Sequence, residues 1–417
     1  MAKFRILSLD GGGCWALIQV RALQALYGEH TRGHDVLALF DLVAANSGGS
    51  IVAAGLAEDF ALSEMLAFFR QEQKRKSLFV RLPWYKRAPR LIGLGPAYRS
   101  ADKLRGLQAL LARNGNRPVD ALPASLRHAA SKTTHFLFVG FDYDRERAVY
   151  FRSNRNSASG SLGSPARVPT AMAVHASTNA PISFFDAPAI ISEDPPGVPP
   201  RRLWDGAITG HNNPIVAAVV EALANGAARD EIEALSLGTA NLFLPMKDSA
   251  VAEDAVLLQE RTGQNLLADI KKIAVSILAD PPDVATFVAH VMLGQTLPRS
   301  EAELPVAGGS VVRMNPLIQP WRDAADSRWI RPAGLTIAQF KALRELNTDA
   351  VEDEEIARID QLCTAWLADQ VNNQPIRANG RTLGCEIGHR LFSAAKAEWL
   401  RRCPLAPPAA PLEPAVA

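Results

Sequence analysis

The fold class is decided by the stretch Phe4-Arg5-Ile6-Leu7-Ser8-Leu9-Asp10-Gly11-Gly12-Gly13. Residues 4–9 are apolar enough for a buried strand, and the three glycines end it. Residues 16–26 then have helical spacing. Residues 40–56 repeat this order, with a strand over 40–45, a sharp turn at 46–49 and a helix of small residues over 50–56. Two strand–turn–helix units in succession predict an α/β fold, with a mainly parallel sheet covered by helices.

Composition and charge exclude several classes of protein. The 417 residues are 48% hydrophobic and 21% charged, which excludes a disordered, collagen-like or coiled-coil chain. The net charge is +2, so no nucleic-acid partner is expected. The 4 cysteines have no C-x-x-C spacing, so we expect neither a disulfide framework nor a cysteine-based zinc site. No secretory signal and no apolar run of ~20 residues is found, which predicts a cytoplasmic protein.

The pattern of elements changes near residue 245. Further strand signals lie at residues 135–141, 148–151, 203–207 and 232–238, and the pattern after residue 245 is mainly helical. We therefore expect an α/β domain over residues 1–245 and a mainly helical portion over residues 246–403 that packs on it. The Pro/Ala-rich residues 404–417 are expected to form a disordered tail.

Ser47 is the best candidate nucleophile. It lies in Ala45-Asn46-Ser47-Gly48-Gly49, which is close to the G-x-S-x-G pattern of a nucleophile elbow. In such an elbow, a tight turn between a strand and a helix projects the serine hydroxyl above the sheet. The neighbours must be small because the turn brings backbone atoms close together. Taken alone, the stretch fits an ordinary Gly/Ser turn equally well.

The Gly11-Gly12-Gly13 loop is a candidate oxyanion hole. It offers backbone N–H groups at the N-terminus of a helix, and two such donors aimed at one point stabilise the oxyanion formed in acyl transfer. A phosphate-binding loop is disfavoured because the lysine of G-x-x-x-x-G-K-[ST] is missing. A purely structural glycine turn is the remaining alternative.

Asp205 is a candidate base at the end of an apolar strand, in the motif Asp205-Gly206-Ala207. Its carboxylate can accept a proton or can bond the backbone of its own turn, and the residues alone favour the turn. His211 follows closely enough in sequence to lie beside this carboxylate, as in a triad.

Taken together, these motifs resemble the patatin-like phospholipase family. That family has D-G-G-G near the N-terminus, then a G-x-S-x-G elbow, then D-G-[GA]. Here the corresponding stretches are residues 10–13, 45–49 and 205–207, in the same order. Residues 176–181 and 235–239 are similar to two further segments of the family, A-x-S-A-A-P and L-S-x-G-T. The resemblance covers roughly residues 4–240.

The resemblance implies a three-layer fold with a helical C-terminal extension, and a catalytic Ser–Asp dyad. In this chain Ser47 would attack an ester carbonyl and Asp205 would accept its proton. The N–H groups of Gly11, Gly12 and Gly13 would stabilise the oxyanion. A free aspartate has a pKa of ~3.9 and is a weak base, so we expect burial to raise the pKa of Asp205. The implied reaction is hydrolysis of acyl esters in phospholipids or related lipids, without a metal or another cofactor.

Some positions depart from the family pattern and leave alternatives open. Trp15 and Ala16 replace the Arg-Gly that usually follows the glycine loop, and Ala45 replaces the first glycine of the elbow. Ala207 replaces a glycine that some members also lack. One alternative is a catalytically inactive protein of the same fold that binds a lipid or a protein partner. Another is a non-lipid esterase or a thioesterase.

Residues 70–90 are basic and aromatic, which predicts transient, peripheral contact with an anionic membrane surface. Each cationic side chain near such a surface contributes ~1 kcal/mol, and aromatic rings enter the interfacial layer. The alternative is a solvated segment whose charges serve solubility. The residues expected to make the contact are Lys74, Arg75, Lys76, Phe79, Trp84 and Tyr85.

Overall fold

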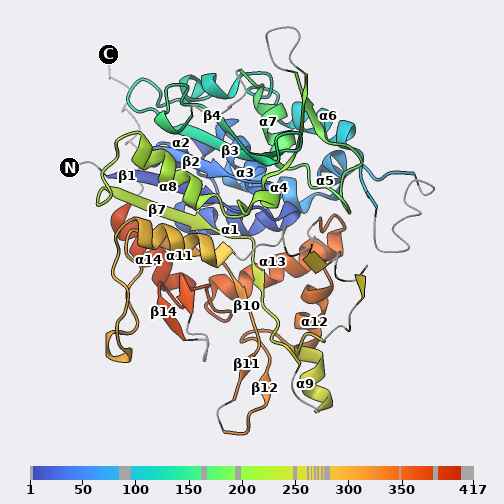
Figure 1. The fold of residues 1–417 in the computed structure, drawn as a ribbon, viewed down its shortest axis with the longest axis vertical. Helices are drawn as coiled ribbons and strands as arrows, with labels where there is room; N and C mark the ends of the chain where they lie inside the picture. The colour runs from blue at the N-terminus through green and yellow to red at the C-terminus, as the bar shows by residue number, and fades with distance from the viewer. Residues whose placement is uncertain are drawn as a thin grey trace, which may run out of the picture.

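The computed structural model describes residues 3–83, 95–160, 167–192, 199–247, 251–260, 263, 265–266, 269, 272–273, 276, 282–323, 325–346, 349–378 and 384–404. Within them, an eight-stranded main sheet has the order β5-β6-β3-β2-β1-β7-β9, with β4 also paired to β3 (Figure 1). The strands of this sheet are β1 (Phe4–Leu9), β2 (Leu42–Ala45), β3 (His135–Asp142), β4 (Arg147–Arg152), β5 (Ala189–Ile191), β6 (Arg201–Asp205), β7 (Ile232–Leu237) and β9 (Val311–Met314).

The centre of the main sheet is parallel. β1 pairs in parallel with β2 and β7, β2 pairs with β3, and β7 pairs with β9. The other three strands, β4, β5 and β6, are antiparallel to their neighbours and lie on the β3 side of the sheet. The α/β class and the mainly parallel sheet predicted from the strand–turn–helix order are therefore confirmed.

Helices cover both faces of this sheet. The α-helices of the described residues are α1 (Leu17–Tyr27), α2 (Gly33–Leu37), α3 (Gly48–Ala57), α4 (Leu62–Arg70), α5 (Glu72–Leu78), α6 (Ser100–Leu110), α7 (Thr170–Ser177), α8 (Ile215–Ala224), α9 (Ala252–Leu257), α11 (Pro282–Met292), α12 (Ile337–Glu345), α13 (Asp353–Leu367) and α14 (Phe392–Arg402). Among them, no helix combines the length and the apolar character needed to cross a bilayer.

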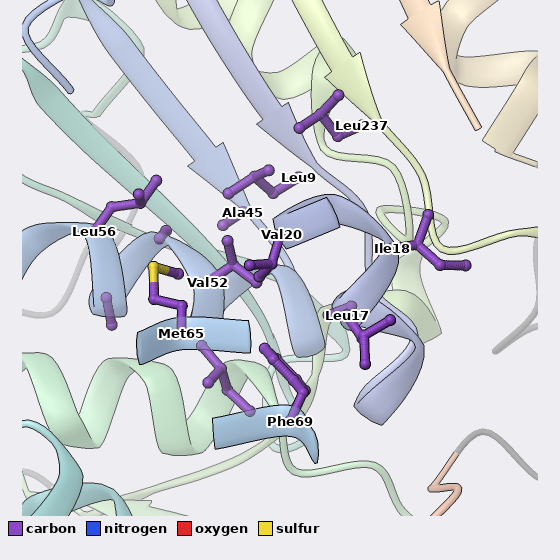
Figure 2. Packing of buried hydrophobic residues seen from close by; sticks show 14 of the residues in the cluster. Leu9, Leu17, Ile18, Val20, Ala45, Val52, Leu56, Met65, Phe69 and Leu237 are labelled. Atoms are coloured by element: carbon purple, nitrogen blue, oxygen red, sulfur yellow. The ribbon is translucent and has the colours of Figure 1, made fainter. Parts of the chain in front are cut away.

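Side-chain alternation along β1 supplies a core to each face of the sheet, because successive strand residues point to opposite faces. Leu7 and Leu9 pack with α1, α3, α4 and α7 on one face, whereas Ile6 packs with α8 and α11 on the other. Figure 2 shows Leu9 and Leu237 of the sheet lying over Val20 of α1. This arrangement gives the three layers that the family resemblance implies.

The portion after residue 245 shares the main sheet with the portion before it. β9 pairs with β7, so the boundary expected at residue 245 divides one sheet. This portion contains the helices α9, α11, α12, α13 and α14 together with short strands. Of the expected tail, residues 405–417 lie outside the described residues. The short strand pairs found among the described residues are β8 (Asn241–Leu242) with β10 (Leu317–Ile318), β11 (Trp321–Arg322) with β12 (Trp329–Ile330), and β13 (Arg377–Ala378) with β14 (Cys385–Ile387).

Candidate active site

Ser47 lies in a strained turn between β2 and α3. Its backbone has φ 48° and ψ −124°, a conformation that side-chain-bearing residues rarely adopt and that costs about 1–3 kcal/mol. The glycine that follows is required by a close approach, since a Cβ at Gly48 would lie 2.4 Å from the carbonyl oxygen of Gly13. These features match a nucleophile elbow, in which the strain holds the serine at the start of the helix.

The pairing of β3 brings Asp205 to this turn. Residues 137–142 of β3 pair with β4 along one edge, so β2 and β6 both occupy the other edge. On that shared edge, Ala45 at the end of β2 pairs with Phe138, and Asp205 at the end of β6 pairs with Gly140. Two residues of strand span only about 6.6 Å. The elbow that leaves β2 therefore meets the end of β6.

The Asp205 carboxylate is buried and hydrogen-bonded. The Ser47 side chain interacts with this carboxylate and lowers its pKa. Its Oδ1 also accepts from Nδ2 of Asn46 at 3.1 Å and from the backbone N–H of Ala207 at 2.9 Å. Burial raises the pKa of Asp205 above its ordinary value, and the hydrogen bonds oppose that rise. The carboxylate thus has the contact and the direction of pKa shift expected of a base.

Ser177 fixes the elbow from the end of α7. Its Oγ accepts a hydrogen bond from the backbone N–H of Ser47 at 3.1 Å and lies 2.9 Å from Oγ of Ser50. Ser177 also contacts Oδ1 of Asn46 at 3.5 Å. The segment similar to A-x-S-A-A-P therefore lies against the elbow, which sequence reasoning did not predict.

The glycine loop abuts the elbow, but only part of it can donate to an oxyanion. A Cβ at Gly11 would lie 3.0 Å from Cβ of Ser47. The N–H of Gly11 donates to the carbonyl oxygen of Asn212 at 2.7 Å, so the prediction that Gly11 is an oxyanion donor is wrong for this conformation. The N–H groups of Gly12 and Gly13 have no acceptor among the described residues, because they begin a 3-10 helix (Gly13–Ala16).

A buried ion pair holds Asp10, the residue that precedes the glycine loop. Arg313 of β9 donates to Asp10 at 3.0 Å from one guanidinium nitrogen and at 2.5 Å from the other, and both side chains are 1% exposed. Arg313 also donates to Oγ of Ser236 at 2.8 Å. Burial raises the pKa of Asp10 to about 6, although the guanidinium opposes the rise. Sequence reasoning missed Arg313, for which the only signal is an arginine within an apolar strand.

The histidine expected near Asp205 lies elsewhere in the hydrogen-bond network. Nε2 of His211 lies 2.8 Å from the Tyr150 hydroxyl, and its Nδ1 lies 3.0 Å from Oγ1 of Thr209. Both of its ring nitrogens are thus engaged by Tyr150 and Thr209 and not by Asp205, which disfavours a Ser–His–Asp triad. The described residues contain no group of three His, Cys, Asp or Glu side chains suited to a metal ion.

The residues expected to contact a membrane divide into three groups. Lys74 and Lys76 are exposed, and Trp84 and Tyr85 lie outside the described residues. The prediction is wrong for Arg75 and Phe79, which are both buried.

Arg75 and Phe79 face the interior. Arg75 is fully buried, donates to the carbonyl oxygens of Phe69 and Val351 at 2.7 Å, and pairs with Asp353 at 2.5 Å. Phe79 packs against aromatic rings of the core. The basic segment therefore serves in part to attach α13, because the acidic N-terminus of that helix is its partner.

Comparison with known proteins identifies the family. The model of the family described as patatin-like phospholipase matches residues 7–219. The chain belongs to the patatin-like phospholipase family. The matched residues of this patatin-like chain contain the elbow, the Asp205-Gly206-Ala207 motif and most of the main sheet.

Individual relatives are more distant. An intracellular phospholipase A2 of Caenorhabditis elegans is 41% identical over 64 residues, which is 15% of this chain and 6% of that protein. The solved structure of VipD from Legionella pneumophila has a TM-score of 0.36 at 11% identity, covering 88% of this chain and 67% of that one. Human GIVD cytosolic phospholipase A2 has a TM-score of 0.35 at 12% identity, covering 87% of this chain and 58% of that one.

Proposed function

We propose that this patatin-like protein is a serine-dependent lipid acyl hydrolase that cleaves acyl esters of phospholipids or related lipids. The observation that carries the proposal is the meeting of Ser47, in its strained turn at the end of β2, with the buried Asp205 at the end of β6. Family membership supports a lipid ester as the substrate. Activity on a phospholipid would take place at a membrane surface, and the exposed Lys74 could contact it, whereas Lys76 is paired with Glu72 and Glu352.

The first half of the reaction forms an acyl-enzyme. Oγ of Ser47 attacks the ester carbonyl carbon while Asp205 accepts the hydroxyl proton. The N–H groups of Gly12 and Gly13 donate to the oxyanion of the tetrahedral intermediate. The intermediate collapses, the ester C–O bond breaks, and Asp205 returns the proton to the leaving alcohol, which is a lysophospholipid when the substrate is a phospholipid.

The second half releases the fatty acid. Asp205 accepts a proton from water, and the oxygen of that water attacks the acyl carbon. The same N–H groups stabilise the second oxyanion, and the bond to Ser47 breaks as its Oγ regains a proton from Asp205. The cycle needs no redox partner, because every proton taken by Asp205 is returned within it.

Substitution of the dyad tests the proposal. We expect Ser47→Ala to abolish fatty-acid release from phospholipid vesicles, and Asp205→Asn to lower it about 10²–10⁴-fold, because the base is lost. Ser131→Ala and Asp144→Asn are the matched controls, since both residues are away from the elbow, and they should keep wild-type rates. Near-native release by either dyad variant would contradict the dyad.

Two further measurements separate the alternatives. A fluorophosphonate probe reacts with an activated serine, so we expect labelling that Ser47→Ala removes. An inactive lipid- or partner-binding protein would show no labelling. A panel of esters and thioesters of rising acyl length distinguishes a lipase, whose turnover should rise with chain length, from a non-lipid esterase or a thioesterase.

A further inference from the structure

A buried lysine lies next to the candidate dyad. Lys103 of α6 is 2% exposed. Its Nζ donates to the carbonyl oxygen of His175 at 3.1 Å and to Oδ1 of Asn179 at 2.9 Å, and it lies 3.9 Å from the centre of the Phe185 ring. An ammonium group has three donors and no lone pair, so two oxygens and the face of a ring are the surroundings that suit it. The contacts therefore fit a charged lysine.

One asparagine connects Lys103 to Asp205. The side-chain oxygen of Asn179 accepts from Lys103 and also from Oγ of Ser100 at 3.0 Å, while its main-chain oxygen accepts from the backbone N–H of Asp205 at 3.1 Å. Its Nδ2 is fixed by the carbonyl oxygen of Ala187 at 2.7 Å. Asn179 stands at an alanine position of the A-x-S-A-A-P pattern, and an alanine there would offer no side-chain oxygen to Lys103.

The lysine and the aspartate influence each other through their charges. The charge of Lys103 lowers the pKa of Asp205, against the larger upward effect of burial. In turn, the Asp205 carboxylate raises the pKa of Lys103, which burial lowers well below its ordinary value. Interactions between charges are strong at such sites because little water screens them.

We propose that Lys103 is a positioning residue that keeps Asp205 ionised and so ready to accept the proton of Ser47. The inference rests on the proposed function, since an ionised Asp205 matters only if it acts as a base. A carboxylate buried without a nearby cation favours its protonated form, which cannot accept a proton. Lys103 supplies that cation while leaving the carboxylate oxygens to Ser47, Asn46 and Ala207.

Other titratable groups around Lys103 do not supply this charge. Burial and the charge of Lys103 lower the pKa of His175 well below its ordinary value, so that ring is neutral at neutral pH. Asp186 accepts the backbone N–H of Ser100 at 2.9 Å, and Asp102 pairs with Arg105 on α6. Among the described residues, Lys103 is thus the cation that acts on Asp205.

The pH dependence of kcat/KM on a soluble nitrophenyl ester tests the proposal in the full-length protein. We expect Lys103→Met and Lys103→Gln to move the acidic limb upward by about one pH unit. At pH values below the limb, kcat/KM of these two variants should be about tenfold lower than that of wild type. At alkaline pH it should stay near the wild-type value. Lys103→Arg keeps the charge and should leave the limb in place. Lys341→Met, at an exposed lysine, is the control and should match wild type.

Each outcome decides the question. An unmoved limb, or an equal loss of activity at every pH, in a folded Lys103→Met or Lys103→Gln protein overturns the proposal and leaves Lys103 a structural residue. Failure of both uncharged variants to fold also counts against it, because charge tuning predicts a folded protein. If wild type shows no hydrolysis that depends on Ser47, the proposed function itself fails, which is a different result.

Discussion

At the scale of single residues, the ionisation of Asp205 is a balance of opposing effects. Burial raises its pKa, whereas the Ser47 side chain, the hydrogen bonds from Ala207 and Asn46 and the charge of Lys103 lower it. The net shift is upward, so the base is protonated at a higher pH than an exposed aspartate would be. We therefore expect activity to fall as pH decreases through this raised pKa.

Removal of one hydrogen bond to Asp205 should move that acidic limb. Asn46→Ala deletes the donor that lies 3.1 Å from Oδ1 of Asp205, which makes the ionised form less stable. We expect the acidic limb of kcat/KM to shift to higher pH, with a smaller change on the alkaline plateau. The pH–rate profile on a soluble ester measures this, and Asn225→Ala, at the end of α8, is a matched control. A limb that moves to lower pH would contradict the account.

At the scale of elements, the site depends on how closely the elbow and the glycine loop approach each other. α3 begins against the 3-10 helix, and only a hydrogen at Gly48 leaves room for the carbonyl of Gly13. Both segments begin helices, whose first N–H groups have no acceptor within their own helix. The geometry of the elements, rather than any one side chain, sets the candidate oxyanion hole.

A methyl group at this contact should disturb the site. Gly48→Ala places a Cβ 2.4 Å from a backbone oxygen that no side-chain rotation can move. We expect a loss of about 1–3 kcal/mol in the free energy of unfolding and slower fluorophosphonate labelling of Ser47. Urea unfolding and labelling kinetics measure the two effects. Gly263→Ala is the control, because its Cβ would meet nothing within 4 Å, and equal behaviour of the two variants would refute the expectation.

At the scale of the whole molecule, the two portions of the chain form one structure. β9 extends the sheet, and Arg313 on that strand reaches the residue that precedes the glycine loop. On the opposite side, Arg75 joins α5 to the start of α13. Figure 1 shows the C-terminal portion, in yellow to red, packed along the N-terminal one. The candidate site therefore depends on residues well outside the matched family region.

Breaking the Asp10–Arg313 pair tests this dependence. Arg313→Met leaves a buried carboxylate without its partner, so we expect a loss of about 3–5 kcal/mol in the free energy of unfolding. The folded-state pKa of Asp10, already about 6, rises further without the guanidinium. A carboxyl group whose pKa is raised in the folded state stabilises that state at low pH, and this stabilisation is lost as pH rises. The loss of unfolding free energy caused by Arg313→Met should therefore be larger at pH 8 than at pH 5.5.

The double variant is the control for this experiment. Asp10→Asn combined with Arg313→Met removes both charges, so its stability should vary less with pH than that of Arg313→Met alone. Urea unfolding at the two pH values provides the comparison. A deficit of Arg313→Met that is the same at both pH values would contradict the assigned role of Asp10.

The sequence by itself determined the local features of this protein. Three features express short-range requirements of the backbone: the strand–turn–helix order, the small residues around Ser47 and the run of glycines. These features predicted the α/β class, the elbow and the family. Such features depend on neighbours within a few residues, which a single sequence displays directly.

Only the tertiary structure decided which distant residues meet. The family resemblance predicted that Ser47 and Asp205 act as a pair, but how they meet follows from two strands that share one edge of β3, and no periodicity in the sequence encodes that register. The same holds for Arg313 beneath the glycine loop, and for Arg75, whose charge suggested a membrane but whose side chain is buried against α13. Ion pairs and hydrogen bonds act over a few ångströms in space, so their partners are set by the packing of the whole chain.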